Sequence, residues 1–421
     1  MKVLVVGAGG REHAIIRALR RSPQAPEVLC APGNPGIARD ARTFGVPVDD
    51  IGGLADLADR EDAGLVVVGP EAPLVAGLAD ELAARGRAVF GPSSAAAALE
   101  GSKAFAKEVM GAAGVPTGSW TAVDDVESGM AAIASYPAVL KFDGLAAGKG
   151  VVIAEDEATA RETLHAFLVE RRFGAGRVVV EQHLVGEELS LFALCDGETA
   201  VAMAPAQDYK RIFDGDRGPN TGGMGSYSPV RGVDAARAAE IARLVHQPVV
   251  DELRRRGTPF RGVLYAGLML TADGPKVIEF NVRFGDPETQ AVLPRLRSDL
   301  LDLMARATTP GGLRGATLEW DDRWAVTLVL ASAGYPESAS KGDVIAGLDA
   351  VPGAVEITHA GTAERGDGAI VTAGGRVLNV TALGLDPAAA RDAAYAAADQ
   401  ITFEGRQLRR DIALRAVEHS A

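Results

Sequence analysis

The first hundred residues alternate short apolar runs with segments of helical spacing. The apolar runs are "KVLVVG", "EVLCA", "LVVVG" and "AVFG", while "REHAIIRALRR" and "LVAGLADELAARG" have apolar residues every three or four positions. This alternation is typical of a parallel α/β sheet. Each apolar run ends in a polar or glycine-rich loop: "GAGGRE", "APGNPG", "GPEAPL" and "GPSS". Because ligands bind at the carboxyl ends of parallel strands, we expect these four loops to form a binding site.

Beyond residue 100 the hydrophobic pattern indicates mixed, largely antiparallel strands. Helices are expected over "SKAFAKEVMGAAG" and near 157–171, 234–256 and 387–400. Strands are expected near 138–142, 151–154, 178–182, 188–195, 324–331, 354–359 and 376–384. The pair Asp273-Gly274 predicts a hairpin turn, and residues 310–320 are expected to form a linker.

Residues 205–230, "PAQDYKRIFDGDRGPNTGGMGSYSPV", show no periodicity and are rich in glycine and polar residues. A loop of this length in a compact domain is usually functional or disordered. Its Asp, Asn, Lys and Gly content favours contact with a ligand.

Length and charge limit the classes to which the chain can belong. At 421 residues it is too long for one core, so two to four domains are expected. The net charge of −13 argues against a general binder of nucleic acid or membrane surfaces, since both are anionic. No apolar run reaches the length of a membrane span and no signal peptide precedes "MKVLVVGAGG", which predicts a cytoplasmic protein. Cys30 and Cys195 end apolar runs, which favours core packing over a disulfide or a metal site.

The first loop, "GAGGRE", is close to a dinucleotide-binding turn but departs from it. Gly7 and Gly9 fit the G-x-G-x-x-G pattern, whereas Glu12 stands at the third glycine and would repel a pyrophosphate. A single phosphate on the backbone amides from Gly9 to Arg11 remains open. Glu12 would then turn towards hydroxyls or an amine.

The segment "VLKFDGLAAGKGVVI" differs from a P-loop, because Gly144 and Gly148 are too close together and a glycine follows Lys149. The β-branched residues after Gly150 predict a strand instead of a helix. A glycine-rich turn between antiparallel strands can fold over phosphates as a flap. Lys149 would counter their charge, and Lys141 on the entering strand could point at the same charge. The alternative is an ordinary hairpin with a solvated lysine.

The segment "VVVEQHLVGEELSLFAL" predicts a strand, a turn and a second strand. A nucleotide base commonly binds along strand-edge backbone, and a ribose needs a carboxylate for its hydroxyls. Glu181, the amide of Leu184, and Glu188 follow one another in the order such a site requires. Surface hairpins also carry glutamate pairs, and that alternative stays open.

The segment "KVIEFNVRFGDPETQ" predicts a metal site. Alternation along 276–282 places Glu279 and Asn281 on one face of a strand, and Ile278 and Phe280 on the other. Two neighbouring oxygen ligands suit magnesium, which also takes waters and phosphate oxygens. Arg283, on the same face, could grip a carboxylate bidentately. The alternative is the solvent face of an edge strand.

The inventory of reactive residues also excludes some chemistry. The six histidines form no metal-ligand spacing, and the chain has no G-x-S-x-G motif. Nucleophilic catalysis by a side chain is therefore disfavoured, and phosphoryl transfer by positioning and charge is favoured.

These motifs, in this order, resemble those of the ATP-grasp ligases and, more closely, of the glycinamide ribonucleotide synthetase family. The motifs are "GGREHA", "APGNPG", "VGPEAPL", "GPS", "LEGSKAF", "DGLAAGKGV", "GPNTGGMGSYSP", "LYAGLM", "VIEFNVRFGDPETQ", "SDL" and "HAGT". The resemblance covers nearly the whole chain. It implies ligation of glycine to 5-phosphoribosylamine with hydrolysis of ATP to ADP and phosphate, in purine biosynthesis. With no protein nucleophile to activate glycine, we expect a glycyl phosphate intermediate.

The resemblance also implies roles for individual residues. Catalysis is expected from Lys149, Arg283 and Asp208. ATP is expected to contact Lys103, Lys141, Gly144, Gly148, Lys149, Gly150, Glu181, Leu184 and Glu188. Magnesium or manganese is expected on Glu279 and Asn281. Substrates are expected to contact Gly10, Arg11, Glu12, Gly33, Asn34, Pro70, Glu71, Asp208, Lys210, Asn220, Thr221, Gly222, Arg283, Asp286 and Pro287.

Within the substrate group, each part of a substrate has an expected position. The loops around Gly10 and Asn34 would hold the phosphate of phosphoribosylamine, and its ribose would lie near Glu71. Asp208, Asn220 and Thr221 would position glycine and its amine.

The implied fold is α/β throughout. It has an N-terminal parallel α/β domain, a two-lobed ATP-grasp region with mixed sheets and a small C-terminal α+β domain. The expected boundaries are 1–100, 101–310 and 311–421, with a small flap lobe at about 117–186. The partners are expected to be small molecules alone, without nucleic acid or membrane, and the chain is expected to be a monomer.

The chain departs from the family pattern at two points. In the adenine-binding hinge of similar enzymes an aromatic residue usually follows two acidic or polar residues, and His183 stands at that position here. Many ATP-grasp enzymes also take a metal ligand from the preceding strand, but "VLYAGLML" offers no acid. Three other functions stay open: a dehydrogenase that binds nicotinamide at "GAGGRE", a nucleotide sensor without catalysis, and a related ligase for another acid or amine.

Overall fold

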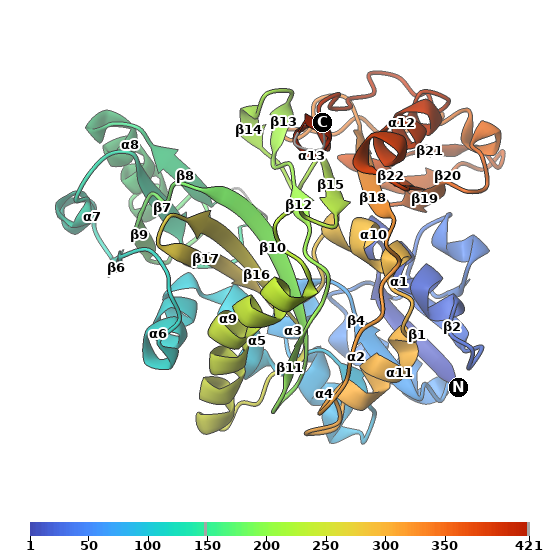
Figure 1. Ribbon diagram of the computed structural model, residues 1–421, viewed down its shortest axis with the longest axis horizontal. Helices are drawn as coiled ribbons and strands as arrows, with labels where there is room; N and C mark the ends of the chain where they lie inside the picture. The colour runs from blue at the N-terminus through green and yellow to red at the C-terminus, as the bar shows by residue number, and fades with distance from the viewer. Residues whose placement is uncertain (147–149, 419–421) are drawn as a thin grey trace.

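The structure is a computed structural model that describes residues 1–146 and 150–418. The expected flap residues Gly148 and Lys149 lie outside the described residues. The described residues form six sheets, with helices packed against them, as Figure 1 shows.

The N-terminal part is the expected parallel sheet, with strand order β3-β2-β1-β4-β5. Its strands are β1 (Lys2–Gly7), β2 (Glu27–Pro32), β3 (Arg42–Thr43), β4 (Leu65–Val68) and β5 (Val89–Phe90). Its helices are α1 (Gly10–Arg20), η1 (Ile37–Arg39), α2 (Ile51–Arg60), α3 (Glu71–Val75) and α4 (Leu78–Ala84). The long strands are continuously apolar because helices cover both faces of the sheet.

A small antiparallel sheet with order β6-β9-β7-β8 forms the lobe at the left of Figure 1. Its elements are β6 (Trp120–Val123), α7 (Val126–Ala132), β7 (Ala138–Phe142), β8 (Val151–Ala154), α8 (Glu157–Leu168) and β9 (Val178–Gln182). Asp156 caps α8 by accepting a hydrogen bond from the amide of Thr159. The lobe has its own apolar core, which includes Leu140, Leu164 and Val178.

The second antiparallel sheet has the order β11-β10-β16-β17. Its strands are β10 (Glu187–Asp196), β11 (Ala200–Ala202), β16 (Arg261–Thr271) and β17 (Gly274–Asn281). Helices α5 (Ser94–Gly101), α6 (Lys103–Ala113) and α9 (Ala235–Arg255) pack beside it. The predicted hairpin is confirmed, since β16 pairs with β17, but Thr271 pairs with Gly274, so the turn residues are Ala272 and Asp273 instead of Asp273 and Gly274.

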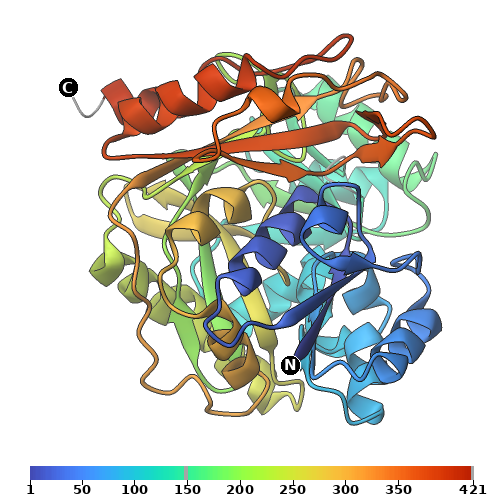
Figure 2. The same ribbon diagram turned by 90° about the vertical axis from the view of Figure 1, so that its right-hand side faces the viewer.

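The C-terminal sheet has the order β12-β15-β18-β22-β19 and lies across the top of Figure 2. Its long strands are β18 (Trp324–Ala331), β19 (Glu356–His359) and β22 (Arg376–Gly384), and α12 (Pro387–Ala398) packs on it. Beside it lies the two-stranded β20 (Thr362–Glu364) and β21 (Ile370–Thr372). The remaining helices are α10 (Glu288–Val292), η2 (Leu293–Arg295), α11 (Leu300–Ala307), η3 (Leu348–Ala350) and α13 (Leu414–Glu418).

The expectation that 205–230 is a loop without regular structure is wrong. The segment holds four short strands, β12 (Gln207–Asp208), β13 (Arg211–Phe213), β14 (Arg217–Asn220) and β15 (Gly225–Ser228). Strand β15 pairs with β18, about a hundred residues further along the chain. Local periodicity cannot signal such a strand, because its small buried residues are held by backbone pairing with a distant partner. The sheet of the expected unit 311–421 is therefore completed by β12 and β15.

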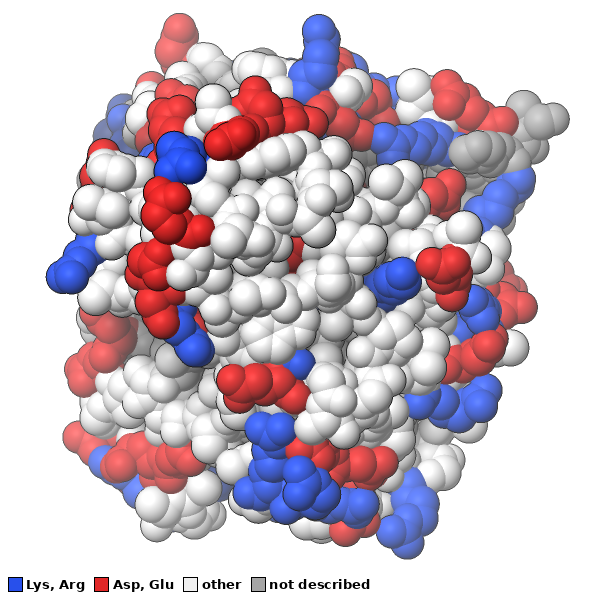
Figure 3. All heavy atoms as spheres, turned by 90° about the vertical axis from the view of Figure 1, so that its left-hand side faces the viewer, with Lys and Arg blue, Asp and Glu red and all other residues white. Residues whose placement is uncertain are grey.

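The surface carries charges of both signs. Figure 3 shows the face at the left of Figure 1, where acidic and basic side chains lie around a broad uncharged centre. Among the described helices, none is long and apolar enough to cross a membrane.

Candidate active site

A cavity of ≈ 840 Å³ is lined by residues from the N-terminal part, both antiparallel sheets and the C-terminal part. Most of the predicted site residues line it. These are Arg11, Glu71, Lys103, Lys141, Gly144, Gly150, Glu181, Leu184, Glu188, Asp208, Lys210, Asn220, Thr221, Gly222, Glu279, Asn281, Arg283 and Asp286. The wall of the cavity does not include Gly10, Glu12, Gly33, Asn34, Pro70 or Pro287.

Three lysines face one side of the cavity. Lys103 begins α6, behind the Ser102 cap, and its Nζ donates to the carbonyl of Gly144 at 3.0 Å. Lys141 on β7 donates to the carbonyl of Ile278 at 2.7 Å. Lys107, one helical turn after Lys103, lies 2.9 Å from Glu181, which is also 3.1 Å from Lys141. Burial lowers the pKa of Lys103, and Glu279 partly offsets that effect.

The pair Glu279 and Asn281 faces the cavity from β17, as predicted. A β-bulge at Ile278 breaks the alternation expected there, so Val277 and Phe280 join the core while Ile278 lines the cavity. The expectation that strict alternation places Ile278 and Phe280 on one face of the strand is therefore wrong. Burial opposes ionisation of Glu279, but Lys210, Lys141 and Lys103 hold its pKa below the ordinary value.

Arg283 is held by protein carboxylates. Its Nη2 donates to Glu100 Oε1 at 2.7 Å and to Asn281 Oδ1 at 3.1 Å, and its Nε donates to Glu71 Oε2 at 3.1 Å. Burial would raise the pKa of Glu71, yet Arg283 and Arg11 lower it to about 2. The carboxylates that Arg283 grips therefore belong to the protein, and Arg283 fixes the orientation of Asn281.

Asp208 and Lys210 form a second charged group at the cavity. Burial, together with Glu288, Glu188 and Glu279, raises the pKa of Asp208 against the opposing effect of Lys210. Lys210 lies 2.8 Å from Glu188, and its pKa is raised by the surrounding carboxylates despite burial. The raised pKa shows that the charged form of the Asp208 carboxyl group needs a further cation to stabilise it, so this group is suited to bind an ammonium group.

A third group at the cavity was not anticipated from the sequence. The buried Glu288 accepts hydrogen bonds from Tyr265 at 2.6 Å and from Ser190 at 3.1 Å. Tyr265 and Ser190 also lie 2.9 Å apart. The signal in the sequence is weak, because each of the three residues stands in a different motif. The pairing of β10 with β16 brings Ser190 near Tyr265, and tertiary packing of α10 adds Glu288.

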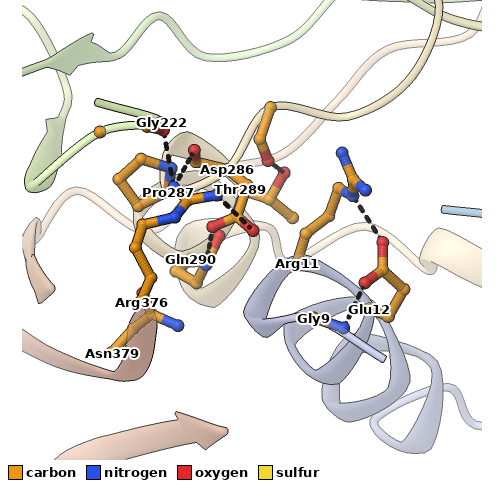
Figure 4. A network of polar contacts seen from close by, with 12 residues as sticks. Gly9, Arg11, Glu12, Gly222, Asp286, Pro287, Thr289, Gln290, Arg376 and Asn379 are labelled. Carbon is orange, nitrogen blue, oxygen red and sulfur yellow. Dashed lines mark hydrogen bonds and ion pairs between the residues drawn. The ribbon is translucent and has the colours of Figure 1, made fainter. Parts of the chain in front are cut away.

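The first loop is used differently from the expectation. Glu12 accepts a hydrogen bond from the amide of Gly9 at 2.6 Å and so caps its own helix, α1, as Figure 4 shows. Arg11 donates to the other oxygen of Glu12 at 2.6 Å. Both oxygens of Glu12 are therefore engaged within the protein, and its contact with substrate hydroxyls or an amine stays a prediction. The amide of Gly9 is likewise already engaged, which leaves the amides of Gly10 and Arg11 for an anion.

The side chain of Asn34 is fully used within the protein. Its Nδ2 donates to the carbonyls of Ala8 and His359, each at 2.9 Å, and its Oδ1 accepts from the amide of Ile37 at 2.9 Å. Asn34 therefore joins the first loop to the C-terminal part. A contact with a substrate phosphate would require breaking one of these bonds.

The C-terminal part reaches the cavity through Arg376, which no motif indicated. Its Nη1 donates to the carbonyls of Gly222 and Asp286, each at 2.6 Å, and its Nη2 lies 3.3 Å from the Asp286 carboxylate (Figure 4). Gln290 holds the other oxygen of Asp286 at 2.7 Å. Burial would raise the pKa of Asp286, but Arg376 and Arg11 lower it.

Comparison with protein-family models assigns almost all of the chain. Residues 1–100, 101–289 and 325–415 match the N domain, the ATP-grasp (A) domain and the C domain of phosphoribosylglycinamide synthetase. The chain belongs to the phosphoribosylglycinamide synthetase family. The resemblance found in the motifs is thus confirmed, and the chain is an ATP-grasp ligase of this family.

Individual relatives agree with this assignment. A phosphoribosylamine–glycine ligase of Streptomyces coelicolor is 52% identical over 423 residues, which cover 99% of each chain. The crystal structure of a phosphoribosylamine–glycine ligase from Thermotoga maritima has a TM-score of 0.85 at 36% identity, over 98% of this chain and 100% of that one. A biotin carboxylase from Campylobacter jejuni, at 15% identity and a TM-score of 0.72 over 99% and 95% of the two chains, shares the fold alone.

Proposed function

We propose that the cavity joins glycine to 5-phosphoribosylamine in two steps, with glycyl phosphate as the intermediate. The overall reaction is that of the phosphoribosylglycinamide synthetase family, in which ATP, glycine and phosphoribosylamine give glycinamide ribonucleotide, ADP and phosphate during purine biosynthesis. The observation that carries the proposal is that one cavity unites Lys103 and Lys141, the side-chain oxygens of Glu279 and Asn281 on β17, and the carboxyl group of Asp208.

The nucleotide would lie between the small lobe and the second sheet. Val139, Val151, Ile153 and Met269 give this end of the cavity an apolar lining suited to a purine base. The turn after β9 contributes Leu184 to the cavity wall. Its backbone can contact the base whichever side chain precedes it, so the presence of His183 does not affect this contact. The phosphates would then extend towards Lys103 and Lys141, whose ammonium groups offset their charge.

Members of the ATP-grasp family bind ATP with a divalent metal, and the donor set here fits one. The described residues contain no group of three or more Asp, Glu, His or Cys that could hold a metal by itself. Glu279 and Asn281 would supply two oxygen ligands, and ATP phosphates and water would complete the set, which suits magnesium or manganese. When bound, the ion would offset the negative charge of the phosphates.

The residues around Asp208 would hold glycine. Its ammonium would pair with Asp208, and Asn220 at the cavity wall can donate to its carboxylate. The carboxylate then attacks the γ-phosphorus of ATP, the bond to the bridging oxygen breaks, and ADP leaves. Lys149, which lies outside the described residues, and Arg283 would offset the charge that develops.

The second step joins the amine to the activated glycine. The nitrogen of phosphoribosylamine attacks the carbonyl carbon of glycyl phosphate, phosphate departs with the electron pair of the C–O bond, and the nitrogen loses a proton. Arg11 and the amide of Gly10 are the candidates for the sugar phosphate, and Glu71 is the candidate for the ribose. Gly33, Pro70 and Pro287 shape the loops behind these residues.

A panel of ADP-release assays tests the substrates. ADP release should require both glycine and phosphoribosylamine, and replacing glycine with alanine or the amine with ammonia should abolish most of it. Faster release with another acid or amine would assign the chain to a related ligase. Binding of ATP without any glycine-dependent release would indicate a sensor, and fluorescence titration with NADH tests the dehydrogenase alternative.

These substrates are small metabolites, and the proposed location of the enzyme is the cytoplasm. The same proposal takes the chain to act as a monomer. Sedimentation equilibrium of the purified protein measures the mass of the particle in solution.

A further inference from the structure

Three buried charges lie together in the wall at the nucleotide end of the cavity. Lys107 on α6 is 2.9 Å from Glu181 Oε2, and Lys141 on β7 is 3.1 Å from Glu181 Oε1. The side chain of Lys107 is 2% exposed, that of Glu181 6% and that of Lys141 3%. Lys107 has no part in the proposed reaction, although a buried ammonium carries a large desolvation cost.

The two lysines are held differently. Lys107 donates a hydrogen bond to Thr117 Oγ1 at 2.7 Å, and Thr117 in turn donates to the carbonyl of Val277. Lys141 donates to the carbonyl of Ile278, and Glu181 Oε1 accepts no hydrogen bond from any described residue. The contact between Lys141 and Glu181 is therefore electrostatic, without the geometry of a hydrogen bond.

The charges of the three groups sum to +1. Glu181 is equidistant, to within a few tenths of an ångström, from two ammonium groups, so it can neutralise one of them. With Lys107 present, the charge of Lys141 is left for a ligand. Without Lys107, Glu181 would neutralise Lys141 and leave the phosphate end of the cavity without that positive charge.

We infer that Lys107 is a positioning residue that neutralises Glu181 and thereby keeps the charge of Lys141 available to the nucleotide phosphates. The inference rests on the proposed function in one respect, namely that the phosphates of ATP lie next to Lys141. It gives Lys107 an indirect role through Glu181, although Lys107 also lines the cavity. Its effect should depend on the charge of Glu181 and on the charge of the ligand.

Four forms of the full-length protein test the inference: the unmodified chain, Lys107→Met, Glu181→Gln and the double variant. The sums of the three charges are +1, 0, +2 and +1, in that order. ADP binding, measured by isothermal titration calorimetry, should weaken about tenfold in Lys107→Met. The double variant should bind ADP within about threefold of the unmodified chain, because it restores the charge. Because Glu181 is itself among the residues expected to contact ATP, Glu181→Gln is the reference for the double variant: removing Lys107 from Glu181→Gln should weaken ADP binding less than removing it from the unmodified chain.

Two controls separate charge from structure. Adenosine, which has no phosphate, should inhibit the unmodified chain and Lys107→Met with the same inhibition constant. Lys2→Met removes a lysine that pairs with Glu61 far from the cavity wall, and it should leave ADP binding unchanged. If Lys107→Met does not fold, Lys107→Gln removes the same charge and takes its place.

The outcomes are distinguishable. Unchanged ADP binding in Lys107→Met, or a double variant as weak as Lys107→Met, overturns the inference. Equal weakening of ADP and adenosine binding also overturns it, because that pattern indicates a structural role for Lys107. An unmodified chain that binds neither ligand refutes the proposed function itself.

Discussion

Replacing Glu279 with Gln should lower the turnover of the ligase at least about 100-fold, with the fold preserved. The substitution keeps the size of the side chain but removes a charge and a strong oxygen ligand. Lys210, Lys141 and Lys103, which hold the pKa of Glu279 low, would then surround a neutral group. Turnover and the dependence of the rate on magnesium concentration are the quantities to measure, together with circular dichroism.

The matched control for this variant is Asp273→Asn. Asp273 is an exposed carboxylate at the turn of the same β16–β17 hairpin, away from the cavity wall. It should leave turnover and magnesium dependence unchanged. If Glu279→Gln keeps both the turnover and the magnesium dependence of the unmodified chain, the metal assignment fails.

Arg283→Met should lower the free energy of unfolding by about 3 kcal/mol and abolish ligase activity. The loss of stability follows because Glu100, which is 9% exposed, and Glu71 both lose their cationic partner. Denaturant unfolding gives the stability, and the ADP-release assay gives the activity. Arg161→Met, which breaks only the exposed pair with Glu127, should cost less than about 1 kcal/mol.

The double variant Arg283→Met with Glu100→Gln separates the two effects. Removing the charge of Glu100 should return most of the lost stability, because Glu100 is the more buried of the two carboxylates and Glu71, which is 30% exposed, keeps partial contact with water. Activity should stay low, since Asn281 is no longer oriented and the charge facing the phosphates is gone. Recovery of activity together with stability would show that Arg283 has a structural role alone.

Much of the fold follows from local patterns in the sequence. The strands at 138–142, 151–154 and 376–384 have the predicted bounds, because apolar alternation and flanking turn residues specify them locally. Strands β12 and β15 could not be predicted, since their pairing partners lie far away in the chain. The bulge at Ile278 likewise depends on the register with β16 and leaves no mark on the strand itself.

In the candidate site, too, residues that belong to local motifs could be predicted, whereas residues brought in by tertiary packing could not. The glycine-rich loops could be recognised directly from the sequence. So could the acid–amide pair on one strand, Glu279 and Asn281. Arg376 and Glu288 could not, because tertiary packing alone brings them to the cavity. The hydrogen-bond partner of Glu12 could be identified only from the structure, since a carboxylate at the third position of a helix can either cap the helix or face a ligand.

The measurement that tests the central claim most directly follows the carboxylate oxygens of glycine. Glycine labelled with oxygen-18 in both carboxylate oxygens is converted with ATP and phosphoribosylamine, and the inorganic phosphate is analysed by mass spectrometry. Because the carboxylate attacks the γ-phosphorus and one of its oxygens leaves with the phosphate, one labelled oxygen should appear in each phosphate released. Phosphate without label, or a phosphorylated protein trapped during turnover, would contradict the glycyl phosphate route.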